Sequence, residues 1–349
     1  MLPFSKEKRK DTLSGIFFVA IFAAAATMIA QLQAVSALGI SPLVVGIVIG
    51  IFYANTLHNK IPSAWESGIT FSAKKILRFA IVFYGFRITF QQIAEVGIDG
   101  FMVSLIMLST TFVLGTYAGI KFFKMDRDTS MLSASGASVC GAAAVLATEP
   151  VLKAQEHKTA VAVSMVVLFG TIAMFLYPVL YTTGILDMSA REFGIYVGGT
   201  IHEVAQVVAV PASVPGLDAE AANAAVIVKM TRVIMIAPML ILLGFYLSYT
   251  ARKEGGEAGK VGLVIPWFAV YFIGVAGFNS LEIVPVNIVN IINEVDTFLL
   301  TMAMTALGMG TRFAKFKGLG LAPLYTAGLM FAWLVIGGYF ITKWVVATF

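Results

Sequence analysis

The chain has 349 residues, of which 59% are hydrophobic and only 12% carry a charged side chain. Soluble domains carry about twice this charged fraction, so the composition excludes a soluble globular protein. The net charge of +5 does not indicate nucleic-acid binding, because the basic residues gather at the ends of apolar runs. A single cysteine excludes an intramolecular disulfide, and three scattered histidines give no pattern for a metal site, so we expect neither a metal nor a cofactor.

Apolar runs of roughly 20 residues recur along the whole chain, and each is long enough to cross about 30 Å of hydrocarbon. The first run follows the basic flank 1–10 and is too long for a signal-peptide core, so we expect it to remain as a span. Eleven hydrophobic segments are predicted, at roughly 13–32, 42–57, 76–93, 100–123, 130–150, 159–181, 192–210, 223–249, 264–281, 286–309 and 319–345. The sequence therefore predicts one integral membrane domain over 1–349, an all-α polytopic protein with about 11 transmembrane helices.

The distribution of cations predicts a cytoplasmic N-terminus, since cytoplasmic loops of membrane proteins are enriched in Lys and Arg. With alternating spans, the cations on that side are Lys6, Lys8, Arg9, Lys10, Lys60, Lys74, Lys75, Arg78, Lys121, Lys124, Arg127, Arg252, Lys253, Lys260, Arg312, Lys315 and Lys317. The expected outer loops carry the carboxylates of Glu95, Asp99, Asp218, Glu220 and Glu282. Lys153 and Lys158 fall in a supposed outer loop, and the alternative is that segment 130–150 dips into the membrane and returns.

The spans after the first suggest an internal repeat. Treating 1–33 as an extra N-terminal helix leaves two sets of five segments, 42–181 and 192–347. An odd number of crossings in each set gives the second set the opposite direction, which is the topology of inverted repeats. Under this scheme segments 130–150 and 286–309 correspond, and both are expected to be discontinuous crossing helices.

A competing self-similarity relates GASVCGAAAV at 136–145 to GGTIHEVAQV at 198–207. Each stretch is followed by a span with a late proline, Pro178 in one case and Pro238 in the other. In the predicted topology these two stretches would run parallel. Matches between small residues arise easily in membrane sequences, so we prefer the inverted scheme and keep this parallel pairing as its rival.

Segment 130–150 is as apolar as a span yet rich in small and hydroxyl residues. A helix broken within the membrane exposes free N–H groups and the positive dipole end of its second half, which suit an anion. Helix–helix packing through small residues is an equally weighted alternative. The predicted substrate-binding residues here are Ser133, Ser135, Gly136, Ser138, Cys140 and Gly141.

A second polar group, His202, Glu203 and Gln206, lies within about one helical turn. A histidine and a carboxylate inside a span are costly in hydrocarbon, and histidine titrates near neutrality. We predict that His202, Glu203 and Gln206 couple protons to transport. The alternative is that they lie near the membrane surface.

Two cations, Lys229 and Arg232, are three residues apart and therefore share a helix face. A buried pair of cations would attract an anionic solute, so both are predicted substrate-binding residues. The alternative is that both side chains extend to the outer surface.

Asn287, Asn290 and Asn293 form a polar stripe followed by Glu294 and Asp296. The stripe fits either a cation site or a solvated helix start, and we expect the solvated helix start.

The stretches 136–150, 198–207 and 228–233 strongly resemble the YeiH-like sulfate exporter family. The likeness also covers 81–87 and 278–308, and it extends over nearly the whole chain in matching order. It implies a bacterial inner-membrane transporter of about eleven spans, similar to the sodium/proton antiporter and bile-acid symporter architecture with crossing broken helices. The implied substrate is sulfate or a related sulfur oxyanion such as sulfite or a sulfonate. The resemblance supplies no ligand residues.

Together these features predict a secondary transporter of a small anion, exporting its substrate and coupled to protons, with no catalytic residues and no enzymatic activity. A passive anion channel is the alternative, and a membrane enzyme using Cys140 as nucleophile is a weaker one. The expected surroundings are the lipid bilayer of the bacterial inner membrane, with no nucleic-acid partner. Carriers of this kind are often homodimers, although nothing in the chain itself indicates a dimer.

Overall fold

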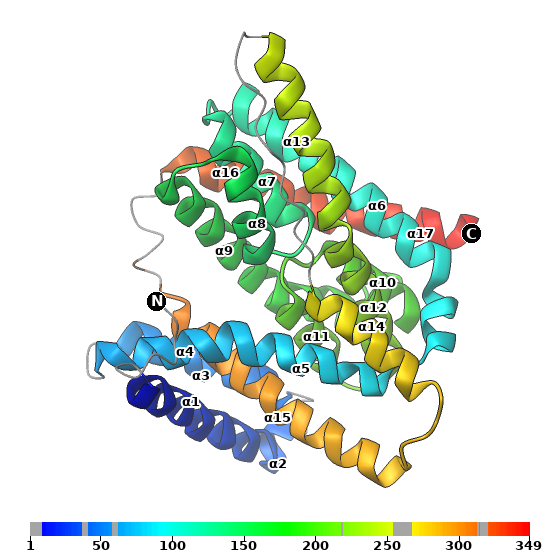
Figure 1. Ribbon diagram of the computed structural model, residues 1–349. Helices are drawn as coiled ribbons and strands as arrows, with labels where there is room; N and C mark the ends of the chain where they lie inside the picture. The colour runs from blue at the N-terminus through cyan, green and yellow to red at the C-terminus, as the bar shows by residue number, and fades with distance from the viewer. Residues whose placement is uncertain are drawn as a thin grey trace. The chain divides into compact units, whose positions relative to one another are not determined.

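The computed structural model describes residues 9–36, 41–57, 62–217, 219–253, 267–312, 314 and 320–349. Throughout these ranges every regular element is a helix (Figure 1). Six of the described helices are long and apolar enough to cross a membrane. The predicted all-α polytopic fold is therefore confirmed. The predicted cytoplasmic cations Lys6, Lys8, Lys60, Lys260, Lys315 and Lys317, and the predicted outer residue Asp218, lie outside the described residues.

The chain forms two compact units. The first contains residues 1–93, 209–217 and 268–316, and the second contains residues 94–208, 218–267 and 317–349. The main helices of the first unit are α1 (Arg9–Ala30), α3 (Pro42–Thr56), α4 (Glu66–Phe71), α5 (Leu77–Tyr84), α14 (Trp267–Asn279) and α15 (Val286–Gly310). The short helix α2 (Gln33–Ser36) follows α1, and one π-helical turn (Ser72–Ile76) joins α4 to α5.

Glycines bring α3 and α15 into close contact in the first unit. A Cβ atom added to Gly50 would lie 2.3 Å from the carbonyl oxygen of Thr305, and one added to Gly308 would lie 2.4 Å from that of Ile47. Small residues permit this close approach of membrane helices. The expectation that segment 286–309 is interrupted is wrong, because α15 is one continuous helix whose small residues pack against α3.

The polar stripe on α15 leads to a buried ion pair within the first unit. Asp296 is only 1% exposed, and its Oδ2 lies 3.3 Å from Nη2 of Arg87. The same Nη2 donates to the carbonyl of Asn293 at 2.6 Å and to Oγ1 of Thr297 at 2.8 Å. Asp296 is therefore not part of a solvated helix start, contrary to our expectation.

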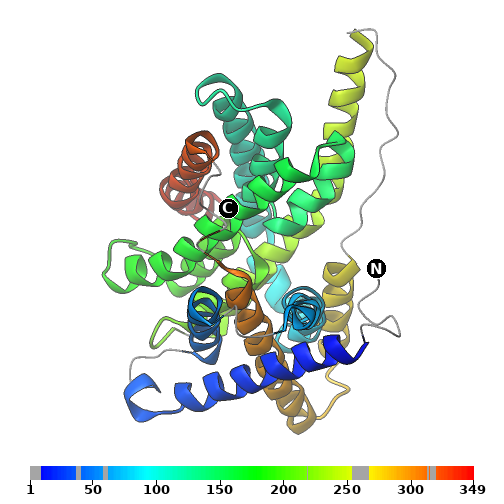
Figure 2. The same cartoon turned by 90° about the vertical axis from the view of Figure 1, so that its left-hand side faces the viewer.

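The described residues of the second unit form four long spans and two pairs of short helices. Their colours run from cyan through green to red in Figure 2. Two of the long spans are α6 (Phe90–Lys121), most of which lies in this unit, and the helix formed by α16 (Leu321–Ala332), a π-helical stretch (Trp333–Gly337) and α17 (Gly338–Thr348). The first short pair is α7 (Arg127–Ser138) with α8 (Ala142–Leu152), followed by the long helix α9 (Glu156–Thr182). The second pair is α10 (Ala190–Thr200) with α11 (Val204–Ala212), which belongs to this unit as far as Val208, followed by the long span of α12 (Ala219–Ile234) and α13 (Ile236–Lys253).

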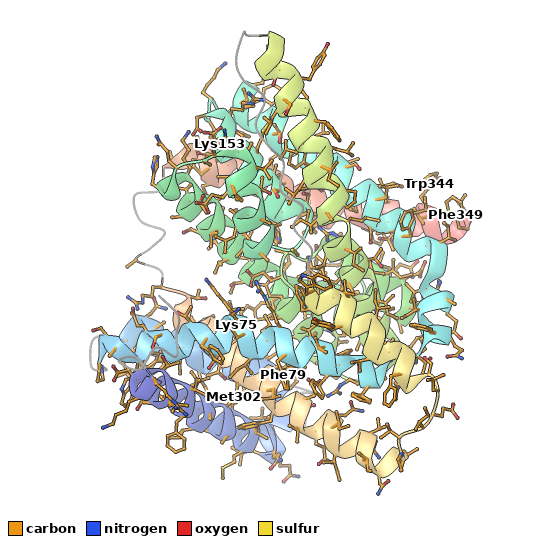
Figure 3. The ribbon with its side chains drawn as sticks, viewed as in Figure 1. Lys75, Phe79, Lys153, Met302, Trp344 and Phe349 are labelled. Atoms are coloured by element: carbon orange, nitrogen blue, oxygen red, sulfur yellow. The ribbon has the colours of Figure 1, made fainter. Side chains whose placement is uncertain are left out.

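Helices α7 and α8 form a hairpin that enters and leaves the unit at the same end. Near its turn, Oγ of Ser135 on α7 lies 2.6 Å from Oγ1 of Thr148 on α8. At its open end, Nζ of Lys158, at the start of α9, lies 2.8 Å from a carboxylate oxygen of both Asp126 and Asp128, at the start of α7. The chain has thus returned to its starting end by Lys153, which lies exposed just after α8 (Figure 3). Segment 130–150 therefore folds as a returning hairpin, the alternative to a crossing helix, and the expectation of a discontinuous crossing helix there is not met.

The ion pair at the open end of this hairpin gives a pH-dependent contribution to stability. Burial raises the pKa of Asp126, but hydrogen bonds from Lys158 and Thr129 outweigh it, so the pKa is lower than the ordinary value of 3.8. A carboxyl group whose folded-state pKa is lowered stabilises the fold above its unfolded-state pKa, and this contribution is lost as the pH falls through the folded-state value. We expect the melting temperature of the wild type to fall below about pH 4 more steeply than that of Asp126→Asn.

The Asp126→Asn variant keeps a side-chain oxygen that can cap α7 by accepting from the N–H of Thr129, as Asp126 does at 3.1 Å. At neutral pH the loss should therefore be small, about 0.2–1 kcal/mol for a partly exposed ion pair. Thermal melting of both proteins between neutral and acidic pH provides the measurement. Parallel pH profiles would show that this carboxylate contributes nothing specific.

Helices α10 and α11 repeat this arrangement. A Cβ atom on Gly194 would lie 2.4 Å from the carbonyl oxygen of Ala221, and one on Gly198 would lie 2.3 Å from that of Ala225, so α10 and α12 run parallel. The chain must therefore return through α11 between them. The rival pairing of 136–145 with 198–207 agrees with the position of the two turns, since α7 and α10 both end two residues after the first glycine of the stretch. The parallel orientation expected for this pairing is wrong, because the two hairpins point in opposite directions.

The two hairpins enter the second unit from opposite ends. The C-terminal part of α6 packs on α7, where a Cβ atom on Gly119 would lie 2.6 Å from Oγ of Ser130. The N-terminal part of α6 meets α10 instead, and Nη2 of Arg191 lies 2.7 Å from Oδ2 of Asp99. Because α6 is a continuous helix from its kink at Gly97 to Lys121, the ends of the two hairpins are separated by most of its length.

The helix α16–α17 also contacts the two hairpins at its opposite ends. Its start meets the segment before α7, where Oγ1 of Thr326 lies 3.1 Å from Sδ of Met125. Its end meets the start of α10, where Nζ of Lys343 lies 3.2 Å from a carboxylate oxygen of Glu192. Two hairpins inserted from opposite ends bring their turns together in the middle of the unit.

Candidate functional site

The turns of the two hairpins, 139–141 and 201–203, form the candidate site. Gly141 begins α8 with φ of +76°, a conformation that favours glycine over residues with a Cβ atom. A Cβ atom there would lie 2.5 Å from Cγ and 3.2 Å from Oε1 of Glu203, so the two turns are in contact. Glycine fits at position 141 for two reasons: the backbone reverses direction there with a positive φ, and the Glu203 side chain approaches the space that a Cβ atom would occupy.

Lys229 on α12 joins the two turns. Its side chain is fully buried, and its ammonium group donates three hydrogen bonds to backbone carbonyls. The acceptors are Val139 at 2.8 Å in the first turn, and Ile201 at 2.7 Å and His202 at 2.6 Å in the second. One buried cation therefore uses all three of its protons to hold both hairpin turns in place.

Arg232, one turn further along α12, is also fully buried. Its guanidinium donates to the carbonyl of Ser138 from Nε at 3.2 Å and from Nη2 at 2.5 Å. It also donates to the carbonyls of Ala137 and Gly198, both at 3.3 Å. These carbonyls lie at the C-terminal ends of α7 and α10.

The helix dipoles explain why two cations are tolerated in this interior. The last four carbonyls of a helix lack intrahelical partners and carry the negative end of the dipole, so a cation nearby is favourable. Lys229 and Arg232 occupy this position for both α7 and α10. The starts of α8 and α11 present the positive dipole end, with N–H groups that the helices themselves do not use.

The second turn supplies the polar groups that the sequence singled out. His202 is 2% exposed, and Glu203 is partly buried beside Gly141. Oε1 of Gln206 accepts a hydrogen bond from the backbone N–H of Glu203 at 3.2 Å, which satisfies one donor at the start of α11. The three residues thus lie at the centre of the unit rather than at its surface.

A small cavity of about 10 Å³ lies between the hairpins. It is lined by Ser133 of α7 and His202 of the second turn, together with apolar side chains of α9 and α16. Oγ of Ser133 and Nδ1 of His202 are buried without a hydrogen-bond partner in the described part of the chain. A cavity of this size holds one water molecule at most, so the site is closed in this conformation.

Of the residues predicted in segment 130–150, some lie at the site and others pack the two helices of the hairpin together. Oγ of Ser135 interacts with Thr148, and Oγ of Ser138 donates to the carbonyl of Ser135 at 3.3 Å. Gly136 lets α7 approach its neighbours, since a Cβ atom there would lie 2.5 Å from Cγ2 of Val166. Cys140 is buried in the first turn. Ser135, Ser138 and Gly136 therefore stabilise the hairpin in this conformation, whereas Ser133 faces the cavity.

Sequence reasoning missed the carbonyls of Val139, Ile201 and Gly198 as partners of the cations. Backbone acceptors carry no residue signature of their own. The similarity of 136–145 to 198–207 could have indicated them. It places a turn at the same point of both stretches, and the carbonyls at the end of the helix before each turn lack partners within that helix.

Comparison with known proteins shows relatives over nearly the whole chain. Residues 14–327 match the family described as Conserved hypothetical protein 698. A UPF0324 membrane protein of Bordetella pertussis is 48% identical over 334 residues, which cover 96% of this chain and 95% of the relative. The UPF0324 inner membrane protein YeiH of Escherichia coli K12 is 45% identical over 326 residues, covering 93% of this chain and 92% of the relative. No solved structure matches the chain.

Proposed function

Because this chain belongs to the UPF0324 family and is a multi-pass protein of the bacterial inner membrane, we propose that it is a secondary transporter of a small anion. The proposed substrate is sulfate or a related sulfur oxyanion, and the proposed direction is export. The observation that carries this proposal is the meeting of two oppositely inserted hairpins around the buried side chains of Lys229 and Arg232.

The proposed topology has nine crossings and two re-entrant hairpins in the described part of the chain. The crossings are α1, α3, α4–α5, α6, α9, α12–α13, α14, α15 and α16–α17. With the N-terminus in the cytoplasm, α7–α8 enters from the cytoplasm and α10–α11 from the outside. Lys153 and Lys158 then lie on the cytoplasmic side, in agreement with the positive-inside rule.

This topology assigns the inverted repeat to α7–α9 and α10–α12, in place of the two sets of five segments. Each half contains one hairpin and one crossing, so the second half runs opposite to the first. Transporters use discontinuous helices of this kind because irregular backbone at membrane depth is tolerated where it lines a buried site. Movement of the hairpins relative to the surrounding spans would give alternating access.

The charges of the site favour an anion over a cation. Lys229 and Arg232 contribute two positive charges, and the starts of α8 and α11 contribute positive dipole ends. The carboxylate of Glu203 lies beside Gly141, at the start of α8, where an oxyanion would also be favoured. We propose that substrate and the Glu203 carboxylate compete for this position, so that protonation of Glu203, with His202 as its relay, accompanies substrate binding.

A panel of oxyanions tests this function. The purified protein is reconstituted in liposomes, and uptake of radiolabelled sulfate, sulfite, thiosulfate and a sulfonate is measured at two pH values, alongside thermal melting with each anion. We expect at least one oxyanion to be transported and to raise the melting temperature, with rates that change with pH. If every oxyanion left both readouts unchanged while a cation moved both, the proposed substrate class would be wrong.

We also propose that the chain is not an enzyme. Cys140 is buried in the first turn, and a nucleophilic cysteine needs an activated thiolate and a route for its substrate. Cys140→Ala is expected to retain most of the transport activity, because the sulfur contributes only a weak acceptor for the backbone N–H of Ala144 and alanine fits the same turn. Transport by the variant in liposomes is the measurement, and complete loss with normal folding would favour covalent chemistry at Cys140.

A further inference from the structure

A large apolar cleft lies on the second unit between α6 and α13, away from the hairpin turns. It has a volume of about 860 Å³ and is lined along most of its length by aliphatic, aromatic and methionine side chains. Several of these residues are widely exposed, among them Val113 at 65% and Leu242 at 69%. A cleft of this volume is within the range of about 300–1,000 Å³ that holds small-molecule ligands.

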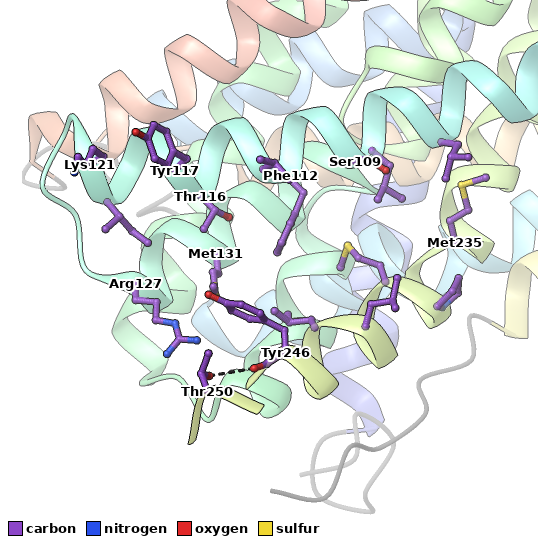
Figure 4. A pocket seen from close by; sticks show the side chains of 18 residues that line it. Ser109, Phe112, Thr116, Tyr117, Lys121, Arg127, Met131, Met235, Tyr246 and Thr250 are labelled. Carbon is purple, nitrogen blue, oxygen red and sulfur yellow. Dashed lines mark hydrogen bonds between the residues drawn. The ribbon is translucent and has the colours of Figure 1, made fainter. Parts of the chain in front are cut away.

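The cleft is amphipathic along its axis (Figure 4). Lys121, Arg127 and Thr250 lie together at one end, whereas Met235 marks the opposite, apolar end. The guanidinium of Arg127 lies 5.7 Å from the centre of the Tyr246 ring, which fixes the cation at the rim of the apolar part.

The two cations at this end have no acidic partner in the described part of the chain. The carboxylates next to Arg127 in sequence, Asp126 and Asp128, both pair with Lys158. Arg127 and Lys121 are exposed and therefore available to an anionic group outside the protein.

The length of the cleft is compatible with the thickness of the hydrocarbon core of a bilayer. At about 1.5 Å per residue, α6 covers about 24 Å from Leu105 to Lys121, which is within the roughly 30 Å of a hydrocarbon core. Water is absent at this depth, so an apolar cleft that opens sideways there is filled by acyl chains or by protein. The cationic end lies on the side that the positive-inside rule assigns to the cytoplasm.

From these observations we infer that the cleft is a binding site for an anionic phospholipid of the cytoplasmic leaflet. Its phosphate binds Arg127 and Lys121, and one acyl chain lies between α6 and α13. Basic pockets between transmembrane helices on this side are suited to such headgroups. Since α13 continues from α12, which carries Lys229 and Arg232, bound lipid would hold the helix that supports the proposed transport site.

Native mass spectrometry of the purified chain tests this site with phosphatidylglycerol and phosphatidylcholine as probes. We expect one phosphatidylglycerol to remain bound under conditions that remove phosphatidylcholine. Lys121→Gln combined with Arg127→Gln should lower the bound fraction about tenfold or more, because the charge-assisted hydrogen bonds to the phosphate are lost. Lys74→Gln combined with Lys75→Gln, two exposed cations of the first unit, should leave it unchanged.

A second variant tests whether the apolar part of the cleft binds the acyl chain. Val113→Trp fills the cleft and should reduce retention of phosphatidylglycerol, whereas Ile336→Trp, an exposed aliphatic position outside the cleft, should not. Equal retention of the two lipids, or an unchanged bound fraction in the Lys121/Arg127 variant, would overturn the proposal. So would retention of inorganic phosphate equal to that of phosphatidylglycerol in the same spectra, or a lipid-free dimer that covers this face. None of these readouts depends on transport, so the lipid site and the proposed function can fail separately.

Discussion

Lys229→Ala is expected to abolish transport and to destabilise the protein severely. The substitution leaves three buried carbonyls, those of Val139, Ile201 and His202, without their donor. Each unsatisfied buried group costs about 1–3 kcal/mol. The sum is a large part of the roughly 5–15 kcal/mol that stabilises a typical protein.

Lys343→Ala is the matched control, since it removes a lysine whose side chain is 38% exposed and pairs with Glu192 at 3.2 Å. Its expected effect on stability is small, because water screens the ion pair of this exposed side chain. Thermal melting and oxyanion uptake in liposomes are compared for the two variants. Similar losses in both would remove the assigned role of Lys229 at the hairpin turns.

Arg87→Ala is expected to give the second large effect, in the first unit. It leaves the carboxylate of Asp296, whose side chain is fully buried, without a counter-charge. Removing one partner of a fully buried ion pair costs about 3–5 kcal/mol, and the loss here should lie at or below the lower end because the Arg87 side chain is 28% exposed. Much of this loss should be recovered in the double variant Arg87→Ala with Asp296→Asn, because the unpaired charge is removed as well.

The control for Arg87 is Arg78→Ala. The guanidinium of Arg78 is exposed and lies 5.8 Å from the centre of the Phe268 ring, an interaction worth about 0.5–1 kcal/mol. The melting temperatures of the three variants and the wild type show whether loss of the Arg87–Asp296 pair destabilises the protein. If the double variant melts no higher than Arg87→Ala, the Arg87–Asp296 pair is not the source of the loss.

The sequence predicted the helical membrane fold well, because apolar runs of membrane length have few alternative structures. It also located the irregular backbone of 130–150, where small and hydroxyl residues replace bulky ones. It gave the return of this segment to its starting side only as the alternative to a crossing. Hydropathy records how apolar a segment is, and a hairpin of two half-length helices is as apolar as one full span.

The choice between the competing repeats depends on geometry that residue types do not encode. The small residues of 305–311 resemble those of a broken helix, yet they serve the close packing of α15 on α3. The positions of Lys153 and Lys158 were the available sign of re-entry, because two cations in an outer loop are unusual. Lys229 and Arg232 were recognised as buried cations, but their carbonyl partners became visible only once both turns were placed.

Cysteine labelling tests most directly whether the two hairpins insert from opposite sides. In a Cys140→Ala background, single cysteines replace the exposed residues Lys124 and Lys153, which flank α7–α8, and Asp187 and Glu220, which flank α10–α11. A membrane-impermeant maleimide is applied to intact spheroplasts and to lysed ones. The account predicts that Asp187→Cys and Glu220→Cys react in intact spheroplasts, whereas Lys124→Cys and Lys153→Cys react only after lysis. Reaction of Lys124→Cys and Lys153→Cys from opposite sides of the membrane would contradict it.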